Sequence, residues 1–112
     1  MYKYVNRIIN GDCLKELKKI PDKSFELVFA DPPYNMQISE KLTRPDASKV
    51  NGVNDKWDKF NSFNHYDEFC KSWLYECKRI LKDNGSIWVI GSYHNIFRLG
   101  YHLQNLNYWL LN

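Results

Sequence analysis

Residues 25–34 read FELVFADPPY, a short apolar run that is closed by an aspartate, two prolines and a tyrosine. A run of this kind fits a buried strand of a parallel sheet, because such a strand is covered on both faces. The prolines cannot continue the ladder of hydrogen bonds, and they stiffen the chain where it leaves the sheet. The sequence therefore predicts a central strand at residues 25–30 with a rigid turn at its carboxyl end.

Apolar runs and helical patterns alternate on both sides of this strand. Further strands are predicted at residues 5–9, 86–90 and 108–111, and helices at residues 13–20, from Ser62 or Asn64 to a stop at Gly85, and over residues 96–106. This alternation is typical of an α/β fold, in which crossover helices join the strands of a mostly parallel sheet. With 112 residues, the chain is expected to form a single domain, residues 1–112.

Composition limits the classes of protein to which the chain can belong. With 44% apolar residues it can build a core, and a net charge of +3 permits contact with a polyanion without requiring it. No apolar run is long enough to span a membrane, and the N-terminus lacks the pattern of a secretory signal, so we expect a cytoplasmic protein with no membrane partner. Three cysteines without a C-x-x-C pair predict neither disulfides nor a metal site, and Cys70 and Cys77 are expected to be buried.

Polar turns follow the predicted strands. Asp12, residues 31–35 and residues 92–95 all lie where a strand is expected to end. Ligands bind at the carboxyl ends of the strands in parallel sheets, so we expect a site where these turns converge. The segment at about 35–61 has no helical or strand period; a loop of this length favours an active-site loop facing the ligand, with a solvated lid as the alternative.

The turn after the central strand has the groups needed to methylate an amino nitrogen conjugated to a π-system. Such a nitrogen is a poor nucleophile until acceptors on both of its N–H bonds favour a pyramidal, electron-rich geometry. The Asp31 carboxylate can be one acceptor and the Pro32 carbonyl the other, with the proline rings fixing the direction of that carbonyl. Tyr34 offers a ring face on which a planar base can stack. A proline-stiffened turn without a chemical role is the alternative.

The string FADPPYN at residues 29–35 resembles motif IV of the S-adenosylmethionine-dependent amino-methyltransferases of DNA. With NGDCL at residues 10–14, RPD at 44–46, DKWDKF at 55–60 and SIWVIGSYHNIFR at 86–98, the chain looks like the beta-class N6-adenine enzymes, in particular the CcrM-like subgroup that methylates GANTC sites. The resemblance implies a partial Rossmann-like methyltransferase fold. It also implies methyl transfer from S-adenosylmethionine to an adenine flipped out of double-stranded DNA.

The resemblance also implies roles for individual residues. Asp31, Pro32 and Tyr34 match the residues that hold the flipped adenine, and Pro33 matches the scaffold between them. The positions that match residues near the cofactor are Asp12, Cys13 and Asp31. The positions that match DNA-facing residues are Asn35, Arg44, Trp57, Lys59, Ser92, Tyr93 and His94. The alternatives are a plain helix cap for Asp12, an aromatic anchor of the loop for Trp57 and an ordinary polar turn for His94.

One motif of the family is missing from the chain. Its five glycines form no G-x-G pair of the kind that binds a nucleotide cofactor in this fold. In the beta class the catalytic half precedes the target-recognition segment and the main cofactor half, so we expect this chain to be the N-terminal catalytic part. By itself it is expected to bind S-adenosylmethionine weakly or not at all and to transfer no methyl group.

Two other functions stay open. One alternative is a non-catalytic module that binds DNA or forms a homodimer through an exposed sheet edge. The other is a cytosine-N4 or glutamine-N5 methyltransferase, because related motifs occur in those families. Aspartate at the first position of the motif, where those families tend to have serine or asparagine, favours adenine.

Overall fold

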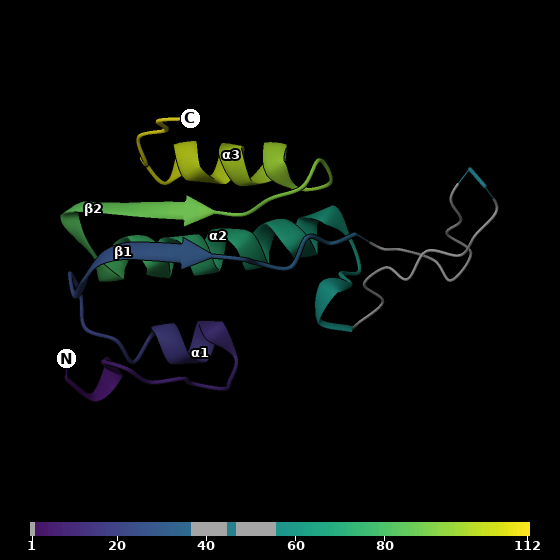
Figure 1. Ribbon diagram of the computed structural model, residues 1–112. Helices are drawn as coiled ribbons and strands as arrows, with labels where there is room; N and C mark the ends of the chain where they lie inside the picture. Colours follow the sequence, from purple (N-terminus) through teal and green to yellow (C-terminus); the bar gives the residue numbers. More distant parts are fainter. Residues whose placement is uncertain (1, 37–44, 47–55) are drawn as a thin grey trace.

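The computed structural model describes residues 2–36, 45–46 and 56–112. In chain order the elements are η1 (Tyr2–Tyr4), α1 (Cys13–Leu17), β1 (Phe25–Ala30), η2 (Lys56–Asp58), α2 (Phe63–Ile80), β2 (Leu81–Val89) and α3 (Ile96–Asn105). Figure 1 shows β1 and β2 side by side in front of α2, which α1 and α3 contact from opposite sides. This α/β architecture with a parallel sheet confirms the predicted fold class.

The two strands pair in parallel, with Val28 opposite Ile87. Side chains alternate between the faces of the sheet. The set that packs against the core on the α2 side is Val28, Ala30, Ile87 and Val89. The set on the other side, here called the open face, is Leu27, Phe29, Trp88 and Ile90, with exposed fractions of 54%, 66%, 60% and 38%. Within the described ranges, no helix lies over the open face (Figure 1).

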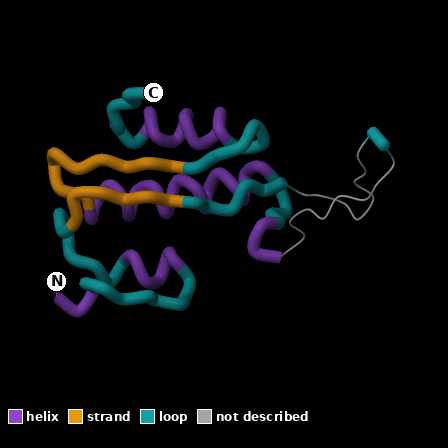
Figure 2. Tube along the Cα trace, in the orientation of Figure 1, coloured by secondary structure: helices purple, strands orange, loops and turns teal. Residues whose placement is uncertain are grey.

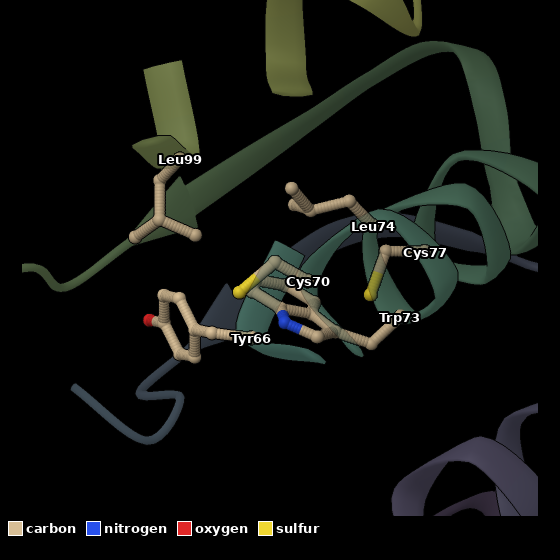
Figure 3. Packing of buried hydrophobic residues seen from close by; sticks show 6 residues of the cluster. All are labelled: Tyr66, Cys70, Trp73, Leu74, Cys77 and Leu99. Carbon is tan, nitrogen blue, oxygen red and sulfur yellow. The ribbon is translucent and has the colours of Figure 1, made fainter. Parts of the chain in front are cut away.

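The core of the described part lies between the sheet and α2. Its buried members, shown in Figure 3, are Tyr66, Cys70, Trp73, Leu74, Cys77 and Leu99. Five of the six come from one face of α2, at the spacing of an amphipathic helix. Cys70 and Cys77 are buried, as predicted, and their burial raises the pKa of the thiols to about 11 and about 12.

The residue just before α2 confirms one of the two predicted caps. The Ser62 hydroxyl accepts a hydrogen bond from the backbone N–H of His65 at 3.1 Å, so Ser62 and not Asn64 caps the helix. A serine at this place satisfies one of the N–H groups that a helix start leaves without a partner.

The end of α2 differs from the prediction that Gly85 stops it. The helix ends at Ile80, because the chain leading into β1 takes over its last carbonyls: Lys23 N–H donates to the Arg79 carbonyl at 2.9 Å, and Ser24 N–H to that of Ile80 at 2.7 Å. Gly85 instead lies in β2 next to an irregularity in the pairing. A Cβ at Gly85 would approach two backbone carbonyl oxygens to 2.9 and 3.1 Å, which explains the glycine.

Two predicted strands are absent from the described structure. Residues 5–9 form no strand, since the sheet of the described part consists of β1 and β2 alone, and Ile8 is fully exposed. Residues 108–111 form none either. There Asn107, with φ of 62°, stops α3, and the N–H groups of Asn107 and Tyr108 bond back to the carbonyls of Gln104 and Leu103 at 3.0 Å.

The chain after α3 docks on α2 instead of joining the sheet. The Tyr108 hydroxyl donates to the Leu74 carbonyl at 2.7 Å, and burial raises the pKa of this phenol. The predicted helix at residues 13–20 is also shorter than expected, since only Cys13–Leu17 is helical and the following residues turn. None of the helices in the described part is both long and apolar enough to cross a membrane.

Candidate active site at the carboxyl ends of the strands

The proline-rich turn leaves the sheet at the carboxyl end of β1, on the edge where the loop after β2 also starts (Figure 2). Asp31 is exposed at the start of the turn, and Pro32 behind it is buried. The Tyr34 hydroxyl donates to Asp31 Oδ1 at 2.6 Å. This bond to a carboxylate raises the pKa of the Tyr34 phenol. The turn therefore presents a carboxylate to solvent with a phenol directly beside it.

A buried tyrosine on α2 fixes the backbone of this turn. The Tyr66 hydroxyl donates to the Pro33 carbonyl at 2.7 Å and accepts from Asn95 Nδ2 at 3.0 Å. Burial raises the pKa of the Tyr66 phenol, so it stays protonated as a donor at neutral pH. In Figure 3 its oxygen lies at the outer end of the ring, pointing away from Trp73 and Leu74.

Asn95 connects the turn after β1 with the turn after β2. Its Oδ1 accepts from the backbone N–H of Ser92 at 2.7 Å, and Ser92 Oγ accepts from the backbone N–H of His94 at 3.2 Å. Asn95 is buried, whereas Tyr93 is 81% exposed and its ring lies 4.3 Å from that of His94. The structure thus brings two predicted site segments together and turns the rings of Tyr93 and His94 towards solvent.

The far end of the long loop returns to the turn after β1. Asp58 in η2 is buried, and its carboxylate accepts the N–H groups of Tyr34 at 2.6 Å, Asn35 at 3.0 Å and Met36 at 3.1 Å. Asn35, predicted to face DNA, is itself only 6% exposed and has φ of 56°. Most of the surface of Asn35 is therefore covered by the surrounding chain.

Phe60 and not Trp57 anchors the returning chain. Phe60 packs against the core, with its ring 4.9 Å from that of Tyr66 and 5.3 Å from that of Phe69. Trp57 is 61% exposed, so the alternative that it is an aromatic anchor is wrong. Lys59 is exposed on the same segment, and Arg44 lies outside the described residues.

Two of the three cofactor candidates, Asp12 and Cys13, lie at the start of α1, on the side of the molecule where the strands end (Figure 1). Asp12 caps this helix, because its Oδ1 accepts the N–H of Leu14 at 2.8 Å. The cap occupies one carboxylate oxygen and leaves Oδ2 for another donor. Partial desolvation of the Cys13 thiol and the nearby charge of Asp12 raise the pKa of that thiol. In the part of the chain that the structure describes, no three His, Cys, Asp or Glu side chains are grouped to hold a metal ion.

Three residues that organise the site were given no individual role from the sequence: Asp58, Tyr66 and Asn95. Tyr66 gave a usable signal, since a tyrosine on the core face of a helix needs a partner for its hydroxyl. Asn95 directly precedes a helix, where asparagine is ordinary as a cap, yet its side chain bonds elsewhere. Asp58 gave no signal, because it stands among charges of both signs in a loop.

Comparison with known proteins adds a family match and two relatives. The profile of a family described as DNA methylase matches residues 25–112. The Type II methyltransferase M.HinfI of Haemophilus influenzae is 58% identical over 109 residues, which are 97% of this chain and 30% of that protein. The Type II methyltransferase M2.MboI of Moraxella bovis is 36% identical over 106 residues, 94% of this chain and 38% of that protein. The chain therefore spans about a third of the length of both relatives.

Proposed function

The chain belongs to the DNA methylase family, and on that premise we propose that it carries the amino-group site of a DNA adenine-N6 methyltransferase. The observation that carries this proposal is the turn after β1, where an exposed carboxylate stands on a backbone held by Asp58 and Tyr66. A site for a weakly nucleophilic amine needs acceptors that are already in place, because reorganising them would raise the barrier.

Asp31 and Pro32 are the two acceptors for the amino group. Oδ1 of Asp31 accepts from Tyr34, and in the described residues no hydrogen bond engages Oδ2, so Oδ2 is the atom that receives one N–H of the substrate. The Pro32 carbonyl receives the other. Together they favour the pyramidal nitrogen whose lone pair would form the new bond to the methyl carbon, while the bond from that carbon to the sulfonium sulfur of the donor would break and leave a neutral thioether. Asp31 accepts the proton once the nitrogen has become acidic.

Tyr34 has two functions in this proposal. Its ring stacks on the flipped adenine. Its hydroxyl donates a hydrogen bond to Asp31 Oδ1 at 2.6 Å and so limits rotation of the carboxylate. Pro33, whose carbonyl accepts a hydrogen bond from Tyr66, is the scaffold that positions the backbone of Tyr34 and therefore its ring.

The methyl donor in this proposal is S-adenosylmethionine, which supplies an electrophilic methyl group. Asp12, Cys13 and Asp31 are the residues of this chain that would contact it. The second carboxylate oxygen of Asp12 fits a hydroxyl or amino group of such a molecule, because the other oxygen is used by the cap of α1. Cys13 is exposed beside it.

The exposed rings and cations around the turn are the proposed DNA-facing residues. All four of these are exposed in the two segments that meet the turn: Tyr93, His94, Trp57 and Lys59. Ser92 is half-buried. Exposed aromatic rings favour stacking on unpaired bases, and a lysine favours a phosphate. Arg44 is proposed as a further contact from the sequence alone.

A chimera tests the function. Residues 1–112 replace the matching segment of M.HinfI, and transfer of a labelled methyl group from S-adenosylmethionine to a duplex with GANTC sites is measured, followed by nucleoside analysis. We expect N6-methyladenine. Asp31→Asn should lower the rate by about 10²- to 10³-fold, the usual effect of losing one preorganised electrostatic contact.

The matched control is Asp83→Asn, since Asp83 is an exposed aspartate whose only described partner is Lys23 at 3.0 Å. This variant should keep the full rate. Label on cytosine N4 would favour the alternative methyltransferase class. A fully active Asp31→Asn chimera would refute the role of Asp31.

A further inference from the structure

Asp58 has an unusual set of partners for a buried carboxyl group. It is 3% exposed, and in the described part of the chain no lysine, arginine or histidine forms an ion pair with it. Its partners are the three successive N–H groups of Tyr34, Asn35 and Met36. A carboxyl group this far from water needs hydrogen-bond donors, and among the described residues these three peptide N–H groups supply them.

The three N–H groups converge because of the backbone of Asn35. Its φ of 56° places it in the left-handed region, which bends the chain so that neighbouring peptide groups point to one side. Such a concave set of N–H groups is a known type of anion-binding backbone. The carboxylate and the bend therefore stabilise each other.

The same contacts fix one particular peptide group. The bond between Pro33 and Tyr34 has its carbonyl held by Tyr66 at 2.7 Å and its N–H held by Asp58 at 2.6 Å. A peptide unit is planar, so holding both ends fixes its orientation. Because proline φ is also restricted at the two preceding residues, little freedom is left in the direction of the Pro32 carbonyl.

We propose that Asp58 is a positioning residue, which orients the Pro32 carbonyl and the Tyr34 ring to receive an adenine amino group. This role rests on the proposed function. Asp58 does not touch the substrate. It acts by clamping the Pro33–Tyr34 peptide group from the side opposite to Tyr66, so the geometry of the two acceptors depends on a residue more than twenty positions later in the sequence.

The first test measures the turn itself in the 112-residue chain. In Asp58→Asn, amide hydrogen exchange at Tyr34, Asn35 and Met36 should quicken by about tenfold or more, since hydrogen bonds to a charged acceptor are stronger than those to a neutral one. Exchange in the middle of α2 should stay unchanged, which separates a local effect from general destabilisation. Asp83→Asn is the matched control and should leave all three amides as they are.

The second test measures base recognition, with 2′-deoxyadenosine 5′-monophosphate as the probe, by chemical-shift titration of the same proteins. The wild-type chain and Asp83→Asn should bind equally, and Asp58→Asn should bind about tenfold more weakly. Asp58→Glu keeps the carboxylate but moves it by one methylene. If Asp58→Asn does not fold, Asp58→Glu is used in its place. It should also bind more weakly.

Each outcome decides between the two ideas. If the folded Asp58 variants bind the nucleotide like the wild type, the positioning role is refuted and the proposed function stands. Unchanged exchange at the three amides refutes it as well. If the wild-type chain itself does not bind the nucleotide, the proposed function fails, and the role of Asp58 fails with it.

Discussion

Replacing Tyr66 by phenylalanine removes one oxygen from the centre of the hydrogen-bond chain that joins the two turns. The ring is 1% exposed and keeps its packing, so no cavity is created. Two bonds are lost, the one to the Pro33 carbonyl at 2.7 Å and the one from Asn95 Nδ2 at 3.0 Å. We expect Tyr66→Phe to lower the free energy of unfolding without changing the packing of the core.

The size of this loss depends on whether each former partner of the Tyr66 hydroxyl can form a hydrogen bond with water instead. Asn95 is 1% exposed, so its amide loses a partner without gaining water, at a cost of about 1–3 kcal/mol. Pro33 is half-buried, and its carbonyl can recover part of the loss from solvent, which leaves about 1 kcal/mol. The sum is about 2–4 kcal/mol, or a fall in Tm of about 8–16 °C for a domain of this size.

Urea unfolding followed by circular dichroism measures this change. The midpoint should fall while the m-value stays the same, because the surface exposed on unfolding is unchanged. Tyr101→Phe is the matched control, since Tyr101 is 62% exposed and its hydroxyl has no hydrogen bond in the described structure; it should cost less than about 0.5 kcal/mol. In a double-mutant cycle, Tyr66→Phe and Asn95→Ala should be non-additive by at least about 0.5 kcal/mol.

A loss below about 0.5 kcal/mol for Tyr66→Phe would refute the reasoning, because surface substitutions already cover that range. Additive effects with Asn95→Ala would do the same, since they would mean that the two side chains do not interact.

The remaining predictions concern other parts of the molecule. Asp31→Asn should lower the pKa of the Tyr34 phenol towards its ordinary value, because the carboxylate that accepts its proton raises it; NMR titration of Tyr34 measures this, and an unchanged pKa would contradict the bond. Because the pKa of Tyr34 is higher in the folded chain than in the unfolded chain, the bond contributes its full stability at any pH below the unfolded pKa of tyrosine. That contribution is lost as the pH rises through the folded pKa, so it should disappear only in the alkaline range. Arg79→Lys should lower the free energy of unfolding in urea by about 2–3 kcal/mol. The Arg79 guanidinium donates to the carbonyls of Leu17 and Ile20 and to two carboxylates, and one lysine cannot replace it. A loss under about 0.5 kcal/mol would argue against these contacts. A thiol reagent at pH 8 should modify one cysteine, Cys13, in the native chain and all three in denaturant, and modification of more than one in the native chain would mean that the core opens.

The elements that could be predicted are those with a strong local pattern. The run at residues 25–30 is apolar, short and followed by prolines, and it forms β1 with the predicted bounds. Cys70 and Cys77, which were predicted to be buried, likewise lie on the buried face of α2. In both places the residues nearby in sequence determine the structure, so pattern and fold agree.

The predicted strand at residues 108–111 was wrong for a physical reason. The run YWLL is as apolar as β1. However, Asn107 adopts a left-handed conformation that ends α3, and the Tyr108 hydroxyl donates a hydrogen bond to the Leu74 carbonyl. The competing interactions are tertiary contacts with α2. A pattern of apolar residues does not reveal them.

The geometry of the candidate site could be predicted only in part. Asp31 and Tyr34 were recognised from their own string, and the structure places their side chains 2.6 Å apart. What holds that string in shape, the Asp58 carboxylate, bonds to amides more than twenty residues away and looks like a solvated charge in the sequence. Long-range hydrogen bonds from side chains to backbone leave no periodic signal.

The open face of the sheet has a practical consequence for work on the isolated chain. Dyes that fluoresce on apolar surfaces are commonly used to detect partly unfolded, compact states. Here Phe29 and Trp88, both more than half exposed, offer such a surface in the fully native chain. We therefore expect such a dye to fluoresce on the folded sheet itself, and its signal must be calibrated against near-ultraviolet circular dichroism before any loss of packing is inferred.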